Sequence, residues 1–215
     1  MPIFFQHQIN ETTRLGIWKI EEAEQFFLSN VPLHSEVTHP HKRLQHLAGR
    51  FLLQFLFPNF PYELIRIADT RKPYLPDEQY HFSISHCGDY AAAIVSNKQR
   101  VGIDIEIPAE KVEKIKEKFL SEEEILKFEI PRLTDGQENS KFATHDLAPL
   151  TLLWSAKESV FKWYGNGKVD FRRHIQLQKM HDYNETIHCL FLKTNQQLTI
   201  HYREFDHLVM AWVES

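Results

Sequence analysis

The apolar residues of the segment 37–57 recur at the spacing of an α-helix. They fall at i, i+3, i+4, i+7, i+8 and i+11 and so form one continuous stripe. The positions are Leu44, Leu47, Ala48, Phe51, Leu52 and Phe55. Pro40 suits the first turn of this helix, and Pro58 predicts its end. The same spacing puts Arg43 and Arg50 together on the flank of the stripe.

A second helical pattern covers residues 150–164. Its apolar stripe consists of Leu153, Ala156, Val160 and Trp163. Glu158 and Lys162 point nearly opposite to this stripe, and Lys157 lies between the two directions. Trp154 precedes the glutamate by one turn, between the stripe and the acid. The pattern therefore predicts an amphipathic helix with an unusual aromatic border on its polar face.

Three runs of residues between 80 and 108 predict β-strands. The runs "YHFSISH" and "DYAAAIVSN" are joined through Cys87-Gly88, and "RVGIDIEIP" follows after a short polar turn. Short strands with such turns predict an antiparallel meander. In the last strand Gly102, Asp104 and Glu106 share one face, because side chains alternate across a strand. We expect Gly102 to leave room on that face for a ligand.

The rest of the second half mixes helical and strand patterns. Residues 109–128 are helical in pattern, and Ser121 and Glu124 are spaced as a capping box. A polar loop is predicted at 131–149, and several short strands follow the second long helix between about 171 and 213.

This order of elements predicts an α+β fold. Both halves hold helices packed on an antiparallel sheet, which indicates two similar, pseudo-duplicated subdomains. We divide the chain into an N-terminal subdomain of residues 1–105 and a C-terminal subdomain of residues 106–215. No proline-rich or low-complexity linker separates them, so we expect a tightly packed boundary.

Composition narrows the functional classes. The chain has 215 residues, 42% of them hydrophobic, and a net charge of −4, which promises no broad basic surface for nucleic acid. Residues 1–100 carry ten Lys or Arg and ten Asp or Glu, against fifteen and nineteen in residues 101–215, so the first half better suits an anionic ligand. Two cysteines make no disulfide framework. We see neither a signal peptide nor a run of about 20 apolar residues, and so expect a cytoplasmic protein without a membrane span.

The acids of "GIDIE" are candidates for a metal site. Asp104 and Glu106 can converge on one hard cation such as Mg²⁺, which accepts a few carboxylates and keeps positions open for phosphate oxygens. In isolation, an acidic edge that faces solvent is the more common explanation for such a pair. The sequence lacks the glycine-rich phosphate loops, the zinc motifs and the GxSxG elbow of other common enzymes.

The other polar motifs also have a structural explanation when each is taken alone. Glu158 and Lys162 have the spacing of a surface ion pair on a helix. Lys72, in "RKPYLP", fits a loop that proline stiffens. Ser85 and His86 fit the hydrogen-bonded end of a strand.

Taken in order, the segments "KPYLP", "HFSISH", "VGIDIE", "FLSEEE" and "WSAKESVFK" resemble the 4′-phosphopantetheinyl transferases of the larger, two-domain type. The strand and helix motifs of that family, G-[IV]-D-[IV]-E and W-[ST]-x-K-E-[AS]-x-x-K, are both met. The likeness runs from about residue 40 to 168. Within it, "KRLQHLAGR" is more similar to the siderophore-associated members than to the surfactin type. The later run "YGNGKVDFRRHIQL" departs from the glycine-rich sequence usual in the family, which bears on the carrier partner.

The resemblance implies a magnesium-dependent transfer of the 4′-phosphopantetheine group of coenzyme A to a serine of an apo acyl or peptidyl carrier protein. It implies that Asp104, Glu106 and Glu158 hold Mg²⁺. Glu158 would also take the serine proton, and Lys162 would contact the phosphates, so Asp104, Glu158 and Lys162 are the expected catalytic residues. The expected coenzyme A contacts, at the interface of the subdomains, are Arg43, Arg50, Lys72, Ser85, His86, Lys157 and Lys162. The direction of Lys157 differs from that of Glu158 by about 100°, which leaves its role open.

Two other functional classes stay open. A non-catalytic module that binds coenzyme A or a carrier protein could keep this fold, although it would most naturally have lost one of the three acids. A magnesium-dependent phosphodiesterase or nuclease would need a broad basic surface. Carrier proteins are acidic, so Lys168, Arg172 and Arg173 are candidates for a local docking patch, as is the polar segment 132–148. We expect a monomer, as the resemblance implies.

Overall fold

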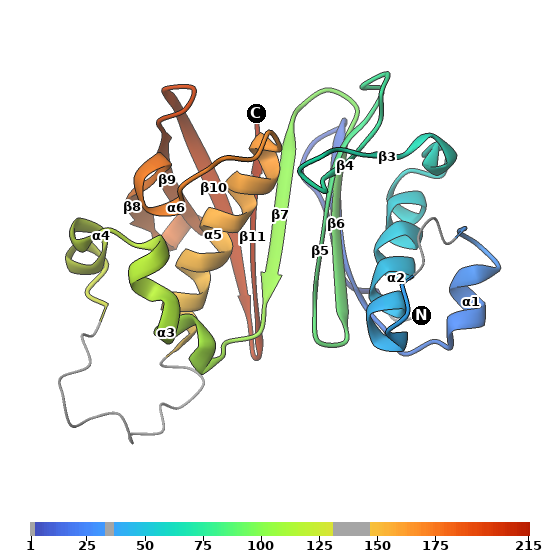
Figure 1. Cartoon of the computed structure of the whole chain (residues 1–215), viewed down its shortest axis with the longest axis horizontal. Coiled ribbons are helices and arrows are strands. Elements are labelled where there is room, and N and C mark those ends of the chain that lie inside the picture. Colours follow the sequence, from blue (N-terminus) through green and yellow to red (C-terminus); the bar gives the residue numbers. More distant parts are fainter. Residues whose placement is uncertain (1–2, 33–36, 131–146) are drawn as a thin grey trace.

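The computed structural model describes residues 3–32, 37–130 and 147–215, and it contains two antiparallel sheets that lie side by side (Figure 1). The first sheet has the strand order β1-β2-β6-β5. Its strands are β1 (Ile3–Gln8), β2 (Thr13–Lys19), β5 (His81–Cys87) and β6 (Tyr90–Ser96). The second sheet has the order β7-β11-β10-β9-β8. Its strands are β7 (Val101–Glu106), β8 (Ile175–His181), β9 (Thr186–Phe191), β10 (Gln196–Phe205) and β11 (Leu208–Glu214). A short pair, β3 (Arg66–Ile67) and β4 (Pro73–Tyr74), precedes β5.

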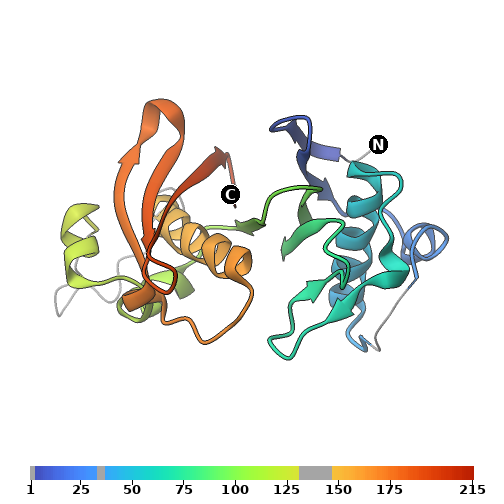
Figure 2. The ribbon, with the colours of Figure 1, turned by 90° about the horizontal axis from the view of Figure 1, so that it is seen from above.

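One long helix packs on each sheet. Helix α2 (Pro40–Leu56) lies against β2 and β6, and helix α5 (Ala148–Tyr164) lies against β7 and β11. The colours of Figure 2 show the N-terminal half at one end of the molecule and the C-terminal half at the other. In the part of the chain that the structure describes, the shorter helices are α1 (Glu24–Leu28), α3 (Glu110–Phe119), α4 (Glu122–Lys127) and α6 (Phe171–His174), together with the 3₁₀ turns Tyr62–Leu64 and Asp182–Asn184. The predicted α+β class, with helices on an antiparallel sheet in each half, is confirmed.

Several local predictions are also confirmed. Helix α2 begins at Pro40 and ends before Pro58. Ser121 and Glu124 form both bonds of the capping box that starts α4. The predicted loop at 131–149 lies mostly outside the described residues.

The two sheets bury a shared apolar layer. Its residues from the first sheet are Leu15, Ile17, Tyr90, Ala92 and Ile94. Its residues from the second sheet are Val101, Ile103, Ile105, Leu208, Met210 and Trp212. The apolar face of β7 therefore looks into the space between the sheets, and its polar face is turned toward α5.

The predicted three-stranded meander is wrong at its third strand. Strands β5 and β6 pair as a hairpin, but β7 pairs with β11 and belongs to the second sheet. The chain crosses from one sheet to the other in residues 97–100. The predicted boundary between the subdomains, at residues 105 and 106, falls within β7. The division into these subdomains stays a prediction.

Strands β5 and β7 are the edges at which the two sheets meet, and side chains join them. Alternate side chains of β5 accept hydrogen bonds from alternate backbone N–H groups of β7 and of Ile107, the residue that follows it. The bonds are Ile103 N to Ser83 Oγ (3.2 Å), Ile105 N to Ser85 Oγ (3.3 Å) and Ile107 N to Cys87 Sγ (3.3 Å). We call these three residues of β5 the seam ladder. It satisfies buried donors that a sheet edge would otherwise leave unpaired.

Gly102 was expected to leave room for a ligand, but the structure shows that it makes room for helix α5. A Cβ atom there would meet the carbonyl oxygen of Ser159 and lie 2.6 Å from the backbone nitrogen of Trp163. The missing side chain lets helix α5 approach β7 closely, so it is the helix and not a ligand that fills the space.

Candidate active site

Three carboxylates gather where α5 crosses β7. Asp104 and Glu106 extend from the polar face of the strand, and Glu158 extends from the helix that Gly102 allows to come close. Burial is the main cause that raises the pKa of Glu158 to about 7, and the negative charges of Asp104 and Glu106 raise it further. The structure thus brings together the three acids that the sequence singled out, and their repulsion favours a cation.

Lys162 contacts this acidic centre from the next turn of α5. Its Nζ donates to Asp104 Oδ1 (2.7 Å) and to Ser85 Oγ (2.8 Å), and the Ser85 hydroxyl donates to the same Asp104 oxygen (2.8 Å). The spacing of Glu158 and Lys162 suggested a surface ion pair. Lys162 instead joins the helix to two strands, β5 and β7. One rung of the seam ladder, Ser85, becomes part of the site.

Glu106 is held by an aromatic residue that the sequence marked as unusual. Trp154 Nε1 donates to Glu106 Oε1 (3.2 Å), and Cys87 Sγ donates to Glu106 Oε2 (3.4 Å). The ammonium group of Lys111 lies 3.5 Å from the second oxygen. The tryptophan at the border of the polar face thus orients a carboxylate.

The three carboxylates are ligands of the chemical type that Mg²⁺ prefers. All three groups offer hard oxygen ligands, and Asp104 Oδ2 is buried without a hydrogen-bond partner among the described residues. Such an atom is costly unless something pairs with it. Across residues 3–32, 37–130 and 147–215, however, no three His, Cys, Asp or Glu side chains converge closely enough to ligate one ion. Sharing a metal would require side-chain rotations at the acidic centre.

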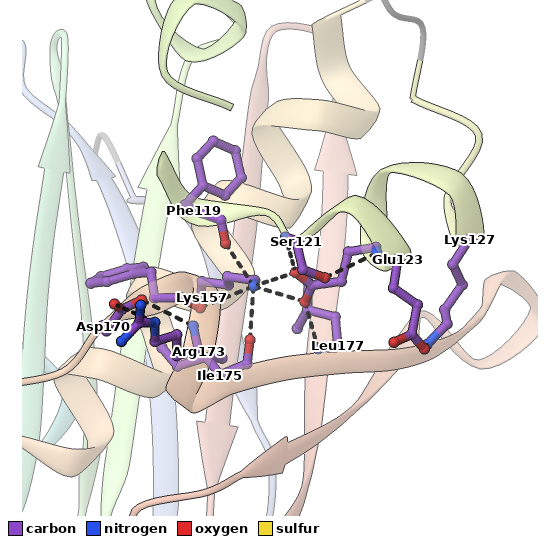
Figure 3. A network of polar contacts seen from close by, with 11 residues as sticks. Phe119, Ser121, Glu123, Lys127, Lys157, Asp170, Arg173, Ile175 and Leu177 are labelled. Carbon is purple, nitrogen blue, oxygen red and sulfur yellow. Dashed lines mark hydrogen bonds and ion pairs between the residues drawn. The ribbon is translucent and has the colours of Figure 1, made fainter. Parts of the chain in front are cut away.

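Lys157 lies on the other side of the helix, and the predicted contact with coenzyme A is wrong for the arrangement observed. Its side chain has no exposed surface, and burial lowers its pKa while Glu124 opposes the shift. The ammonium group forms an ion pair with Glu124 (2.7 Å) and donates to three carbonyl oxygens (Figure 3). These belong to Phe119 (2.8 Å), Phe171 (3.1 Å) and Ile175 (2.7 Å). The lysine ties α5 to four neighbouring elements, α3, α4, α6 and β8.

Lys72 caps the end of α5. Its Nζ donates to the carbonyl oxygen of Lys162 and, at 3.5 Å, to that of Trp163. Burial, and then the nearby charge of Arg100, lower its pKa to about 8. A cavity of about 220 Å³ lies beside it, lined among others by Thr70, Lys72, Ser83 and Lys162. Lys72 thus faces the predicted ligand region while it holds the helix.

A row of basic side chains leads from α2 to the acidic centre. Arg50 is 9% exposed, and its Nη1 has no hydrogen-bond partner within the described residues. The rings of His46 and His86 lie 5.6 Å apart. Burial lowers the pKa of both histidines; the charge of Arg50 also lowers that of His46, and the charge of Lys162 that of His86. We call Arg50, His46, His86 and Lys162 the cation row.

Two outcomes concern the predicted basic helix. Arg43 is engaged elsewhere, because its Nε and Nη2 donate to the two carboxylate oxygens of Glu24 (2.7 and 2.8 Å). Its contact with coenzyme A stays a prediction that the observed pairing does not favour. His46 was not among the expected site residues, although its spacing from Arg50 on the helix puts both on one flank.

The comparisons with known proteins agree with the motifs on β7 and α5. The model of the 4′-phosphopantetheinyl transferase superfamily matches residues 100–213, which is more than half of the chain. The chain belongs to this superfamily. The matched region contains all three carboxylates of the acidic centre and Lys162.

Individual relatives match the chain over a slightly larger share of its length than the superfamily model does. The chain is 36% identical over 143 residues to enterobactin synthase component D of Escherichia coli K12. The alignment covers 61% of this chain and 60% of that relative. The chain is 34% identical over 123 residues to the 4′-phosphopantetheinyl transferase gsp of Aneurinibacillus migulanus, 56% of this chain and 46% of the relative. The chain thus spans about half to three fifths of these relatives. No helix in the described part of the chain is long and apolar enough to cross a membrane.

Proposed function

We propose that this protein transfers the 4′-phosphopantetheine group of coenzyme A to a serine of an apo carrier protein and releases adenosine 3′,5′-bisphosphate. The observation that carries the proposal is the junction of two opposite charge groups at Lys162. On one side of this lysine lie three carboxylates, and on the other side lie His86, His46 and Arg50, the rest of the cation row. A substrate with separate phosphate groups and a bound metal fits such a junction.

Coenzyme A would lie across the seam between the two sheets. Arg50 and Lys162 of the cation row offer charge to its phosphates, and the unpartnered Nη1 of Arg50 leaves a donor for one of them. The two histidines offer ring nitrogens, because burial lowers the pKa of both. Lys72 and the cavity beside it extend this surface toward the end of α5. His86 and Ser85 connect the cation row to Asp104.

Asp104, Glu106 and Glu158 would hold Mg²⁺. The ion would neutralise charge on the pyrophosphate during transfer. The unpartnered Oδ2 of Asp104 and the raised pKa of Glu158 support this assignment.

Glu158 is the proposed base. In the transfer, the carrier serine loses its hydroxyl proton to the carboxylate, and the serine oxygen forms a new bond to the phosphorus that bears the pantetheine arm. The bond from that phosphorus to the bridging oxygen of the pyrophosphate breaks, and the electron pair leaves with adenosine 3′,5′-bisphosphate. A carboxylate whose pKa lies near 7 suits proton transfer at neutral pH.

The carrier is proposed to dock on a local basic patch near α6. Lys168, Arg172 and Arg173 give this segment positive charge, although the chain as a whole is negative. One relative is a component of enterobactin synthase, so carrier domains of such synthases are the first to test. We expect the protein to act as a monomer in the cytoplasm.

Intact mass spectrometry of an apo carrier protein incubated with the protein, coenzyme A and Mg²⁺ tests the proposal. The carrier should gain the mass of one phosphopantetheine group. Asp104→Ala and Glu158→Ala should each lower turnover by about 100-fold or more, while Glu117→Ala, on the exposed face of α3, should not. Binding of coenzyme A without mass gain on several carriers would instead favour the non-catalytic module. Near-native turnover of either acidic variant would overturn the assignment of the site.

A further inference from the structure

A second cavity, of about 280 Å³, lies at the C-terminal end of α5. Its walls come from both halves of the chain: the segment 68–82, the start of β7, and the last turn of α5. Lys72 and Pro73 also line the cavity that we assign to coenzyme A, so this segment separates the two spaces. Asp104, Glu106, Glu158 and Lys162 do not line this second cavity.

Three basic side chains line this cavity. Lys72, His81 and Arg100 come from different segments, and Glu78 is the one carboxylate among the described lining residues. Burial is the main cause that lowers the pKa of both Lys72 and His81; the charge of Arg100 lowers both further, while Glu78 opposes the shift at His81. Lys72 and Arg100 therefore lie close enough to repel one another, and an anion would relieve that repulsion.

The remaining walls are largely aromatic. They include Tyr74, Tyr80, Phe82 and Trp163. Trp163 is 3% exposed, and its Nε1 has no hydrogen-bond partner among the described residues. A volume of about 280 Å³ equals that of about nine water molecules. This space is small for a nucleotide but sufficient for a planar ring with one acidic group.

We propose that this cavity binds a small organic oxyanion with a planar, apolar body, such as an aromatic carboxylate. The acidic group would lie among Lys72, His81 and Arg100, and the body would pack on the aromatic walls. The inference does not depend on the proposed function, because it uses no residue of the acidic centre. A bound anion would join the segment 68–82 to the end of α5, and so hold Lys72 in its capping position.

Benzoate is the probe, and inorganic phosphate is the comparison. Titration of the wild-type protein, without coenzyme A, is followed by the indole N–H signals in ¹H–¹⁵N spectra, with that of Trp163 assigned through Trp163→Phe. Benzoate should shift this signal and bind more tightly than phosphate. Arg100→Gln should weaken benzoate binding about tenfold or more, the scale of one charged hydrogen bond. Lys98→Gln, two residues away and exposed, is the matched control.

Several results would overturn the inference. They are the absence of a benzoate shift, phosphate binding as tight as benzoate binding, and benzoate binding that Arg100→Gln leaves intact. Loss of benzoate binding in His86→Gln, with Arg100→Gln unaffected, would place the probe in the coenzyme A region instead. His81→Gln provides a second variant if Arg100→Gln does not fold, and it should weaken benzoate binding as well. None of these results depends on carrier modification, so failure here is distinguishable from failure of the transferase proposal.

Discussion

Replacing Lys157 by methionine removes the centre of a buried polar cluster and keeps most of the apolar stem. Four acceptors lose their donor: the carboxylate of Glu124 and the carbonyl oxygens of Phe119, Phe171 and Ile175. No water can replace the ammonium group easily, because Lys157 has no exposed surface and Glu124 is 3% exposed. The variant therefore leaves an uncompensated charge in the core.

The expected loss of stability is large. Breaking a buried ion pair by removing one partner costs about 3–5 kcal/mol, and the stranded carbonyl groups add to this loss. Glu124 still accepts hydrogen bonds from the backbone of Ser121 (2.8 Å) and Leu177 (2.9 Å), which limits the damage. We expect Lys157→Met to lower the free energy of unfolding by about 4 kcal/mol. That is a substantial part of the 5–15 kcal/mol typical of folded proteins.

Urea unfolding followed by tryptophan fluorescence measures this loss, provided that the slope of the transition is unchanged. Lys127→Met is the control, because Lys127 pairs with Glu123 on the surface, where such pairs contribute about 0.3–0.5 kcal/mol. The double variant Lys157→Met/Glu124→Gln should recover part of the loss, because it removes the stranded charge. A loss below about 1 kcal/mol would refute the structural role. So would a folded Lys157→Met protein that has specifically lost affinity for coenzyme A.

Three further predictions concern α5 and the seam. In metal-free protein, folding raises the pKa of Glu158 from 4.5 to about 7, so the protonated carboxyl group stabilises the folded state. This stabilisation is complete below pH 4.5 and is lost as the pH rises through about 7. Thermal unfolding between pH 4 and 8 measures it. Gly102→Ala should lower the free energy of unfolding by about 1–3 kcal/mol or more, because its Cβ would lie 2.6 Å from the backbone nitrogen of Trp163. Ser83→Ala should cost about 1–3 kcal/mol and speed hydrogen exchange at the Ile103 amide, which loses its acceptor.

Two of these predictions have a matched control variant, and each has an outcome that would contradict it. Glu158→Gln should lack the pH-dependent component, and an unchanged pH profile in that variant would contradict the assignment. Gly16→Ala should be milder than the Gly102 substitution, because its nearest contact would be 3.2 Å, to the carbonyl oxygen of Phe5. Equal losses for the two glycine variants would contradict the close approach of α5 to β7. Unchanged exchange at Ile103 in Ser83→Ala would mean that the serine is not its acceptor.

The sequence predicted the elements with strong local signals. The stripes of α2 and α5, the capping box at Ser121 and the hairpin of β5 and β6 are set by neighbouring residues. The strand β7 was recognised, but its partner was not. Val101–Glu106 pairs with residues about 100 positions away, and no local pattern specifies such a partner.

The site was predictable to a similar degree. Period-two alternation puts Asp104 and Glu106 on one face, and the motif on α5 pointed to Glu158. The role of Lys157 was not predictable, because a lysine on a helix is usually exposed. Only the packing of α4 and β8 around α5 shows that Glu124 is its partner. The capping of α5 by Lys72 is likewise a tertiary contact that spacing does not show.

The seam ladder has a consequence for exchanging parts between related proteins. Pairing through backbone groups tolerates almost any side chain, whereas the edges of β5 and β7 meet through the side chains of Ser83, Ser85 and Cys87. A chimera that takes one half from a relative keeps this joint only if small hydroxyl or thiol residues recur at these alternate positions. Valine at any of them would remove a rung and leave an N–H group of the other half without an acceptor. Whether two halves from different relatives can pack together therefore depends on three side chains of β5.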